Sequence, residues 1–173
     1  LINTWENFGK PKKFNFVELG PGDGSLAKTL LDTFKKFPEF DSVKKIYLYE
    51  KSNYLKKVQE RKIVDKSVKW IKDFKNIKDG PVIFFGNEFL DSIPIKQFKK
   101  KNDSYFEKNY ILNKNFDIEE TYRKASKVNS KILKSYLSIK DLNFIEFPKL
   151  GFENLKKITK KILKLEGCIL LID

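Results

Sequence analysis

Apolar and polar positions in the first part of the chain predict a strand, a turn and a helix, in that order. Residues 14–20 are rich in β-forming side chains and stop at a turn that contains three glycines. Residues 25–34 then place their apolar side chains at the spacing of one helical face. Ser25 stands where the N-cap of this helix is expected.

The pattern continues with further strands that alternate with helices. Residues 45–50 and 68–71 predict two short strands, and Ser52 or Asn53 could cap the helix between them. The continuous apolar run 81–86 is typical of a strand buried on both faces of a parallel sheet. This alternation predicts an α/β fold with a doubly wound, mostly parallel sheet, right-handed crossovers and helices on both faces.

The second half of the chain begins with a different pattern. In the segment 95–122, polar and apolar residues alternate about turn-forming Asn102, Asp103 and Asn113. This alternation predicts an antiparallel β insertion between the fourth and fifth core strands, with its ribbons added to the core sheet.

The remaining residues return to helices and extended pieces. A helix is expected at 125–139, an extended piece at 144–147 and another helix at 151–165. Gly167 would end that last helix before a final strand at 168–172.

Composition limits the kinds of site that the chain can offer. His is absent and Cys168 is the one cysteine, so we expect neither a disulfide framework nor a metal site. Cys168 lies in the apolar run of the final strand and is expected in the core. No apolar run reaches the roughly 18 residues of a membrane span, and no signal peptide opens the chain, so an intracellular protein without a membrane span is expected.

The net charge of +13 and the pI near 9.6 are values that a nucleic-acid-binding protein would also show. Arginine, which is favoured for bidentate phosphate contacts, occurs only at Arg61 and Arg123, and the excess is lysine spread over nearly every segment. Such a distribution is typical of a base-composition bias, and we expect no nucleic-acid partner. The chain also begins without Met and ends on a strand-like run, which indicates truncation at both ends.

The strongest candidate site is the turn Glu18-Leu-Gly-Pro-Gly-Asp-Gly24 after the first strand. Its glycines let the backbone approach a ligand closely, and its spacing differs from the G-x-G-x-x-G of dinucleotide-binding proteins. An acid inside the turn would repel a diphosphate and suits the ammonium group of S-adenosyl-L-methionine. The alternative is a connecting turn without a ligand. The cofactor contacts predicted here are Glu18, Gly20, Gly22, Asp23 and Gly24.

Two further acids follow strands and could contact the same cofactor. Glu50 closes the second strand, where a carboxylate can accept hydrogen bonds from both hydroxyls of a ribose. Asp73, just after the third strand, could accept from the adenine amino group. For Asp73, an ordinary role as a solvated loop acid is an equal alternative.

The fourth strand ends in a polar segment at the edge where open α/β sheets bind substrates. Asn87, Glu88 and Asp91 are the candidate catalytic residues, and Asn87 is also a candidate cofactor contact. Methyl transfer requires mainly that the nucleophile be positioned, which an amide and two carboxylates can do. Glu88 could pair bidentately with a guanidinium acceptor. The alternative is helix capping by Asn87 or Asp91.

These motifs together resemble the MidA-like family of S-adenosylmethionine-dependent methyltransferases. The segment Asn-Glu-Phe-x-Asp-x-x-Pro is the specific part of the resemblance, since the glycine turn would fit any methyltransferase of this fold. The family usually has Arg or a neutral residue in place of Asp23. The matching segments are Val17–Gly24, Tyr49–Ser52 with Gln59, Trp70, Asn87–Pro94 with Gln97 and Phe98, and Gly167 before Leu171–Asp173.

The resemblance implies a class I methyltransferase fold and S-adenosyl-L-methionine as cofactor. It also implies cofactor contacts by the glycine turn and Glu50, and an active site lined by Asn87 and Glu88. We then expect one incomplete domain over 1–173. Its predicted parts are a cofactor-binding core at 1–94, an inserted substrate-side subregion at 95–150, and a helix with the fifth core strand at 151–173.

The mitochondrial member of the family is an arginine methyltransferase required for the assembly of respiratory complex I. We therefore expect a protein substrate, with arginine of a complex I subunit as acceptor. The expected location is the bacterial cytoplasm or the mitochondrial matrix. Self-association through the sheet edge left by the fifth strand, or through the insertion, is also expected. The alternatives are a non-catalytic assembly module that keeps the fold and a basic RNA-binding methyltransferase.

Overall fold

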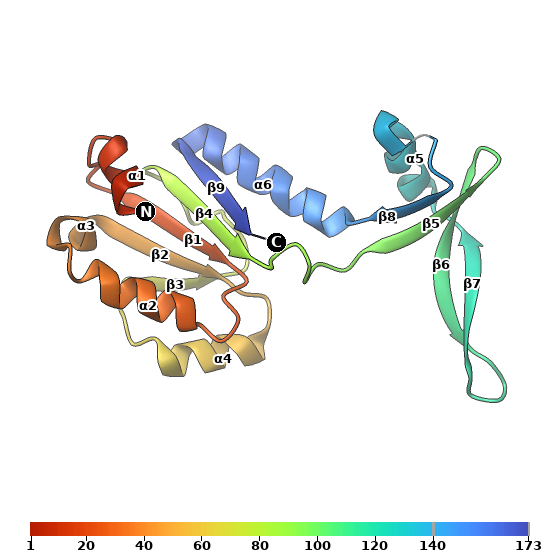
Figure 1. The fold of residues 1–173 in the computed structure, drawn as a ribbon, viewed down its shortest axis with the longest axis horizontal. Helices are drawn as coiled ribbons and strands as arrows, with labels where there is room; N and C mark the ends of the chain where they lie inside the picture. Colours follow the sequence, from red (N-terminus) through yellow and green to blue (C-terminus); the bar gives the residue numbers. More distant parts are fainter. Residues whose placement is uncertain (140, 173) are drawn as a thin grey trace. The chain divides into compact units, whose positions relative to one another are not determined.

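The computed structural model describes residues 1–139 and 141–172, and the chain divides into two compact units (Figure 1). The first unit comprises Leu1–Ser92 with Glu153–Asp173, and the second comprises Ile93–Phe152. Asp173, the last residue of the expected fifth core strand, lies outside the described residues. The division into three parts made from the sequence stays a prediction.

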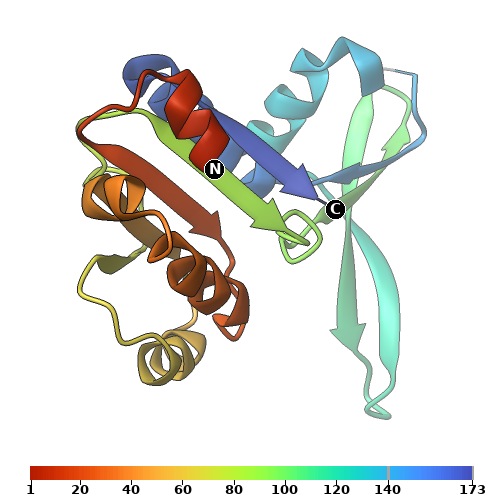
Figure 2. The same cartoon turned by 60° about the vertical axis from the view of Figure 1, so that its left-hand side comes forward.

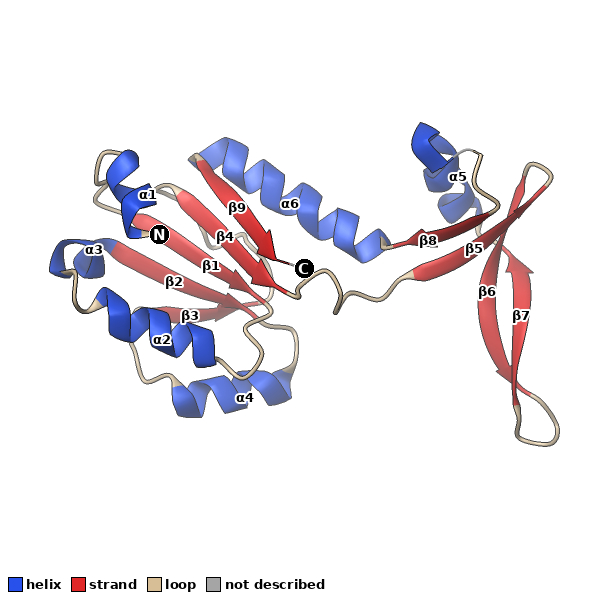
Figure 3. Cartoon of the chain, in the orientation of Figure 1, coloured by secondary structure: helices blue, strands red, loops and turns tan. Residues whose placement is uncertain are grey.

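The first unit is built on a five-stranded sheet in the order β3-β2-β1-β4-β9, and every neighbouring pair is parallel. This order confirms the doubly wound sheet. Figure 3 separates its strands from the helices. The strands are β1 (Phe14–Leu19), β2 (Lys44–Tyr49), β3 (Val68–Ile71), β4 (Val82–Asn87) and β9 (Gly167–Ile172). The helices are α1 (Ile2–Asn7), α2 (Ser25–Phe34), α3 (Pro38–Val43), α4 (Asn53–Lys62) and α6 (Lys149–Leu165), of which α6 begins among the residues of the second unit.

Helices cover both faces of this sheet, with α1, α2 and α4 on one face and α6 on the other (Figures 1 and 2). On the first face, the rings of Trp5, Phe14 and Phe34 each lie 4.9 to 5.6 Å from the ring of Phe40. Aromatic packing of this kind explains α1 and α3, two short helices that the apolar spacing did not predict. On the other face, α6 buries Ile158.

The second unit is a separate antiparallel sheet in the order β7-β6-β5-β8. The insertion is confirmed, but the expectation that its ribbons join the core sheet is wrong, because both edges of β5 are paired within the unit. Buried side chains of this sheet pack with Leu133 of α5. The elements are β5 (Lys96–Lys101), β6 (Ser104–Leu112), β7 (Ile118–Lys124), β8 (Phe144–Phe147), α5 (Lys127–Ser135) and the 3₁₀ helix Leu137–Ile139.

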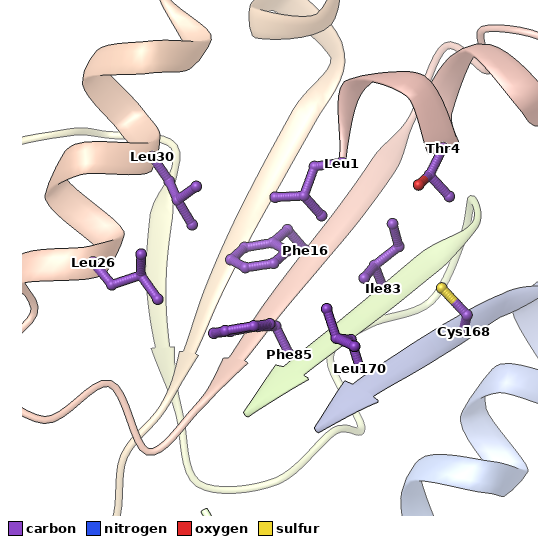
Figure 4. A pocket seen from close by; sticks show the side chains of 9 residues that line it. All are labelled: Leu1, Thr4, Phe16, Leu26, Leu30, Ile83, Phe85, Cys168 and Leu170. Atoms are coloured by element: carbon purple, nitrogen blue, oxygen red, sulfur yellow. The ribbon is translucent and has the colours of Figure 1, made fainter. Parts of the chain in front are cut away.

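Two local expectations are wrong for clear reasons. The N-cap of α2 is Gly24, not Ser25, and the Ser25 N–H bonds to the Asp23 carboxylate at 2.9 Å. Cys168 is exposed, because its side chain lies on the α1/α2 face of β9 and borders a cavity there instead of packed side chains (Figure 4). It lines an apolar cavity of about 300 Å³ together with Leu170 and Phe85.

The expected cap of α4 is confirmed, since Ser52 Oγ accepts from Leu55 N–H.

Gly80 lies in the loop that leads into β4 and packs against the backbone of Lys13, just before β1. Substitution at Gly80 therefore tests how closely these two segments approach each other. Gly80 and Gly9 have nearly equal φ angles of +80° and +77°, but a Cβ on Gly80 would lie 2.4 Å from the Lys13 carbonyl oxygen, whereas Gly9 is open. We expect Gly9→Ala to lower the free energy of unfolding by roughly 1–2 kcal/mol, the cost of the left-handed conformation. Gly80→Ala should lose a further 1–3 kcal/mol or so from the clash. Urea unfolding checks this, and equal losses would show that the approach to Lys13 is not tight.

Candidate functional site

Parallel register brings three loops to one edge of the first sheet. Leu19, the last residue of β1, pairs with Tyr49 at the end of β2 and with Gly86 near the end of β4. The strand order reverses direction between β1 and β4, and open α/β sheets bind ligands outside the carboxyl ends of the strands at such a point. The glycine turn, Glu50 and the segment after β4 therefore surround the edge where a ligand is expected.

The glycine turn takes a conformation that requires glycine. Gly20, Gly22 and Gly24 have φ angles of +66°, +56° and +81°, a region that side chains disfavour. A Cβ on Gly24 would lie 3.1 Å from the Gln59 and Ile63 side chains, whereas one on Gly22 would meet no atom within 4 Å. The backbone at Gly22 is thus open to close approach by a ligand.

Gln59 of α4 connects the turn to the acid at the end of β2. Its Nε2 donates to the Gly22 carbonyl at 2.8 Å and to Glu50 Oε2 at 3.1 Å. Its Oε1 accepts from Trp70 Nε1 at 2.8 Å, and the side chain is fully buried. One amide thereby holds the open turn and a carboxylate next to each other.

Glu50 is itself held in place by two hydrogen bonds. Its Oε1 accepts from the Ser52 N–H at 2.7 Å and its Oε2 accepts from Gln59, while the residue is 8% exposed. A carboxylate can accept about four hydrogen bonds, so Glu50 retains capacity for two more. This capacity suits a pair of neighbouring hydroxyls.

Glu18 is buried beside the turn and lacks a full set of partners. It is 4% exposed, and its Oε2 has no hydrogen-bond partner. Alternation along β1 places it on the same face of the sheet as Phe16, which packs beneath α1 and α2. Burial raises the pKa of Glu18 from 4.5 to about 7. An unpaired buried carboxyl of this kind is suited to a cationic partner.

The other two acids expected at the cofactor are engaged by their own chain. Asp23 accepts from the Ser25 N–H and hydroxyl and forms an ion pair with Lys62 at 2.5 Å, and the Lys62 hydrogen bond lowers its pKa. Asp73 accepts from the Lys75 N–H at 2.8 Å within a turn. Their predicted cofactor contacts stay predictions, and these bonds give both side chains a structural role.

The candidate catalytic residues lie where β4 ends. Asn87, Glu88 and Asp91 are all exposed, and the residues that follow form turns, so helix capping does not account for them. Glu88 has a φ of +52° and its N–H donates to the Ile172 carbonyl at 2.7 Å. This bond fixes the backbone of Glu88 against β9 and leaves its side chain exposed.

Gln59 belongs to the candidate site, but the sequence-based prediction named it only among the residues that match the family and assigned it no role. It lies at helical spacing from Leu55 and Ile63, on the stripe of α4 that faces the sheet. A polar residue on an apolar helical stripe is the signal that could have found it, because such a group must bond inside the protein.

The model of a family described as "Putative S-adenosyl-L-methionine-dependent methyltransferase" matches residues 1–173. The chain belongs to this family. The cofactor expected from the sequence is thus confirmed at the level of the family, as are the resemblance and the fold.

Relatives of this family member include mitochondrial proteins from animals. "Protein arginine methyltransferase NDUFAF7 homolog, mitochondrial" of Caenorhabditis elegans is 32% identical, over 68% of this chain and 33% of its own length. "Protein arginine methyltransferase NDUFAF7, mitochondrial" of Xenopus laevis is 29% identical, over 61% of this chain and 30% of its own. The chain thus spans about one third of the length of these curated relatives.

A solved structure supports the fold of this family member. A COG1565 superfamily protein from Burkholderia thailandensis, bound to S-adenosyl-homocysteine, superposes with a TM-score of 0.68 at 14% identity. The match covers 91% of this chain and 40% of that one. Within residues 1–139 and 141–172, no helix combines the length and apolar character needed to cross a membrane.

The buried carboxyl of Glu18 predicts a pH-dependent stability. Because its folded-state pKa of about 7 lies above the ordinary 4.5, the stability that this group contributes is present below pH 4.5 and is lost as the pH rises through 7. Glu18→Gln should match wild type near pH 4.5 and exceed it by roughly 3 kcal/mol above pH 8. Urea unfolding across this pH range checks this prediction. Glu60→Gln, on the exposed face of α4, is the control and should show no such pH-dependent gain. A constant difference between Glu18→Gln and wild type at all pH values would contradict it.

Proposed function

We propose that this chain binds S-adenosyl-L-methionine at the carboxyl edge of β1, β2 and β4, as the cofactor-binding part of a methyltransferase that modifies a protein side chain. The observation that carries the proposal is the pair of hydrogen bonds from Gln59 Nε2, which holds the open glycine turn beside Glu50. Membership of the family supports it.

The residues at this edge fit the chemical groups of the cofactor. Gly22 offers backbone that a ligand can approach, Glu50 offers acceptors for ribose hydroxyls, and Glu18 offers a buried carboxylate for the ammonium group. Asp23 was expected to repel a diphosphate and attract the ammonium group, but Lys62 neutralises its charge. The fit to the cofactor therefore rests on the other residues of this edge. When bound, the cofactor supplies an electrophilic methyl group on a positively charged sulfur.

The acceptor side is proposed at the segment after β4. Glu88 would pair with a guanidinium through both carboxylate oxygens and orient one nitrogen, while Asn87 and Asp91 would hold the neighbouring groups. The names of the relatives, which call them protein arginine methyltransferases, support arginine as the acceptor. By family resemblance, the protein that carries this arginine is a subunit of respiratory complex I.

Calorimetric titration with S-adenosyl-homocysteine tests the cofactor site. Wild type should bind, and Gly22→Val should abolish binding because its side chain fills the space that the ligand approaches. Gly9→Val is the matched control, since Gly9 has a similar left-handed φ and equally open surroundings. Glu50→Gln should bind about ten- to a hundredfold more weakly, because charge-assisted hydrogen bonds are lost, whereas Glu60→Gln should bind like wild type. Binding by Gly22→Val equal to that of Gly9→Val would overturn the site.

Transfer of radiolabelled methyl groups from the cofactor to unstructured peptides tests the acceptor. Peptides with a single arginine should be labelled in preference to matched lysine peptides, and Glu88→Gln should reduce labelling about tenfold or more at unchanged cofactor affinity. Cofactor binding without labelling of any peptide would instead favour a non-catalytic assembly module.

A further inference from the structure

The antiparallel sheet of the second unit has two unlike faces. On one face, Phe98 and Ile145 lie opposite each other on β5 and β8, are at most 3% exposed and pack in the cluster that includes Leu133 of α5. On the other face, Phe144 is 43% exposed and Lys99 is also exposed. A single exposed aromatic side chain is ordinary, whereas a contiguous group of them marks a surface for a ligand, so the neighbours of Phe144 decide its meaning.

Register places a row of alternating aromatic and basic residues across this exposed face. Lys99 of β5 pairs with Phe144 of β8 on one side and with Phe106 of β6 on the other. Phe106 pairs in turn with Lys124 of β7. Directly paired residues of neighbouring strands have side chains on the same face, so the row Phe144, Lys99, Phe106, Lys124 runs over all four strands.

A hollow of about 570 Å³ lies on this face, and Lys99, Lys101, Phe106, Tyr122 and Phe144 are among the residues that line it. The Lys99 ammonium lies 4.2 Å from the centre of the Tyr122 ring. No acidic side chain lines the hollow within the part of the chain that the structure describes. The hollow therefore combines positive charge with three aromatic rings.

Two acidic groups near the hollow already accept hydrogen bonds. Glu120 of β7 accepts from Lys108 at 2.6 Å, and this hydrogen bond, followed by one from Tyr122 and a smaller contribution from the charge of Lys99, lowers the pKa of Glu120. Glu146 of β8 accepts from Gln97 at 2.7 Å. Among the described residues, no ion pair involves Lys99, Lys101 or Lys124, so these three ammonium groups can face an external anion.

We infer that this face binds single-stranded nucleic acid, independently of the proposed cofactor site. Bases stack on the rings of Phe106 and Phe144, and phosphates lie against Lys99, Lys101 and Lys124. The Tyr122 ring holds the Lys99 ammonium in place between them. Rings interleaved with lysines suit this ligand because every base has a flat face and every linkage carries a negative charge. An acidic peptide would use the charge and leave the rings without planar partners. Strand pairing brings Lys124 and the aromatic rings beside Lys99 and Lys101, an arrangement that composition alone does not reveal.

Fluorescence anisotropy of the whole chain with a labelled single-stranded RNA of about 12 nucleotides tests the inference. Binding should weaken steeply between about 50 and 200 mM salt. The double variant Lys99→Gln, Phe144→Leu should lose at least about tenfold in affinity. The double variant Lys57→Gln, Tyr54→Leu is the matched control, because it removes the same charge and an exposed ring from α4 and should retain wild-type affinity. Phe144→Tyr keeps a ring and should also retain it.

Four results would overturn the inference. Equal losses in the two double variants would show a general attraction to positive charge. Equal affinity for an oligonucleotide of the same length without bases would show that the rings take no part. Binding of an acidic, tyrosine-containing peptide in place of the RNA, or no binding by a wild type whose circular dichroism shows the expected sheet content, would exclude nucleic acid as the ligand.

Discussion

The candidate site depends on the register of three parallel strands. Because Leu19 is in register with both Tyr49 and Gly86, the strands β1, β2 and β4 end at the same edge of the sheet. The loops that follow them therefore lie next to one another. A slip of one residue would turn every side chain of a strand to the other face and would remove Glu18 from its buried position. Burial of aromatic side chains on the α2 face, with Phe14 and Phe16 almost fully enclosed, makes such a slip costly.

Elements set by local spacing could be predicted from the sequence, and elements set by distant contacts could not. The helix at 25–34 and the strand at 68–71 agree with α2 and β3 to the residue, because their apolar spacing is a local property. The helix α3 was missed because Phe40 is held by aromatic rings from three other elements. Cys168 was placed in the core because an apolar run does not reveal which face of an edge strand is covered.

The same division applies to the two proposed sites. The glycine turn and Glu50 are visible in the sequence because each follows a strand, where ligands of α/β folds are bound. Gln59 acts through hydrogen bonds to Gly22, Glu50 and Trp70, which belong to three other segments of the chain, so only the fold reveals its position. The row on the second sheet is likewise a product of pairing, since Phe144 and Lys99 are adjacent in space but distant in sequence.

The buried carboxyl of Glu18 also couples ligand binding to proton uptake and release. With a pKa of about 7 it is close to half protonated at neutral pH, so a cationic group that comes to rest against it displaces the proton from the protonated fraction of the molecules. The heat of binding would then include the ionisation heat of the buffer and would change when one buffer replaces another. Acidification would weaken the hold on a cation while adding the stability that the neutral Glu18 carboxyl contributes, so these two effects of one group would respond to pH in opposite directions.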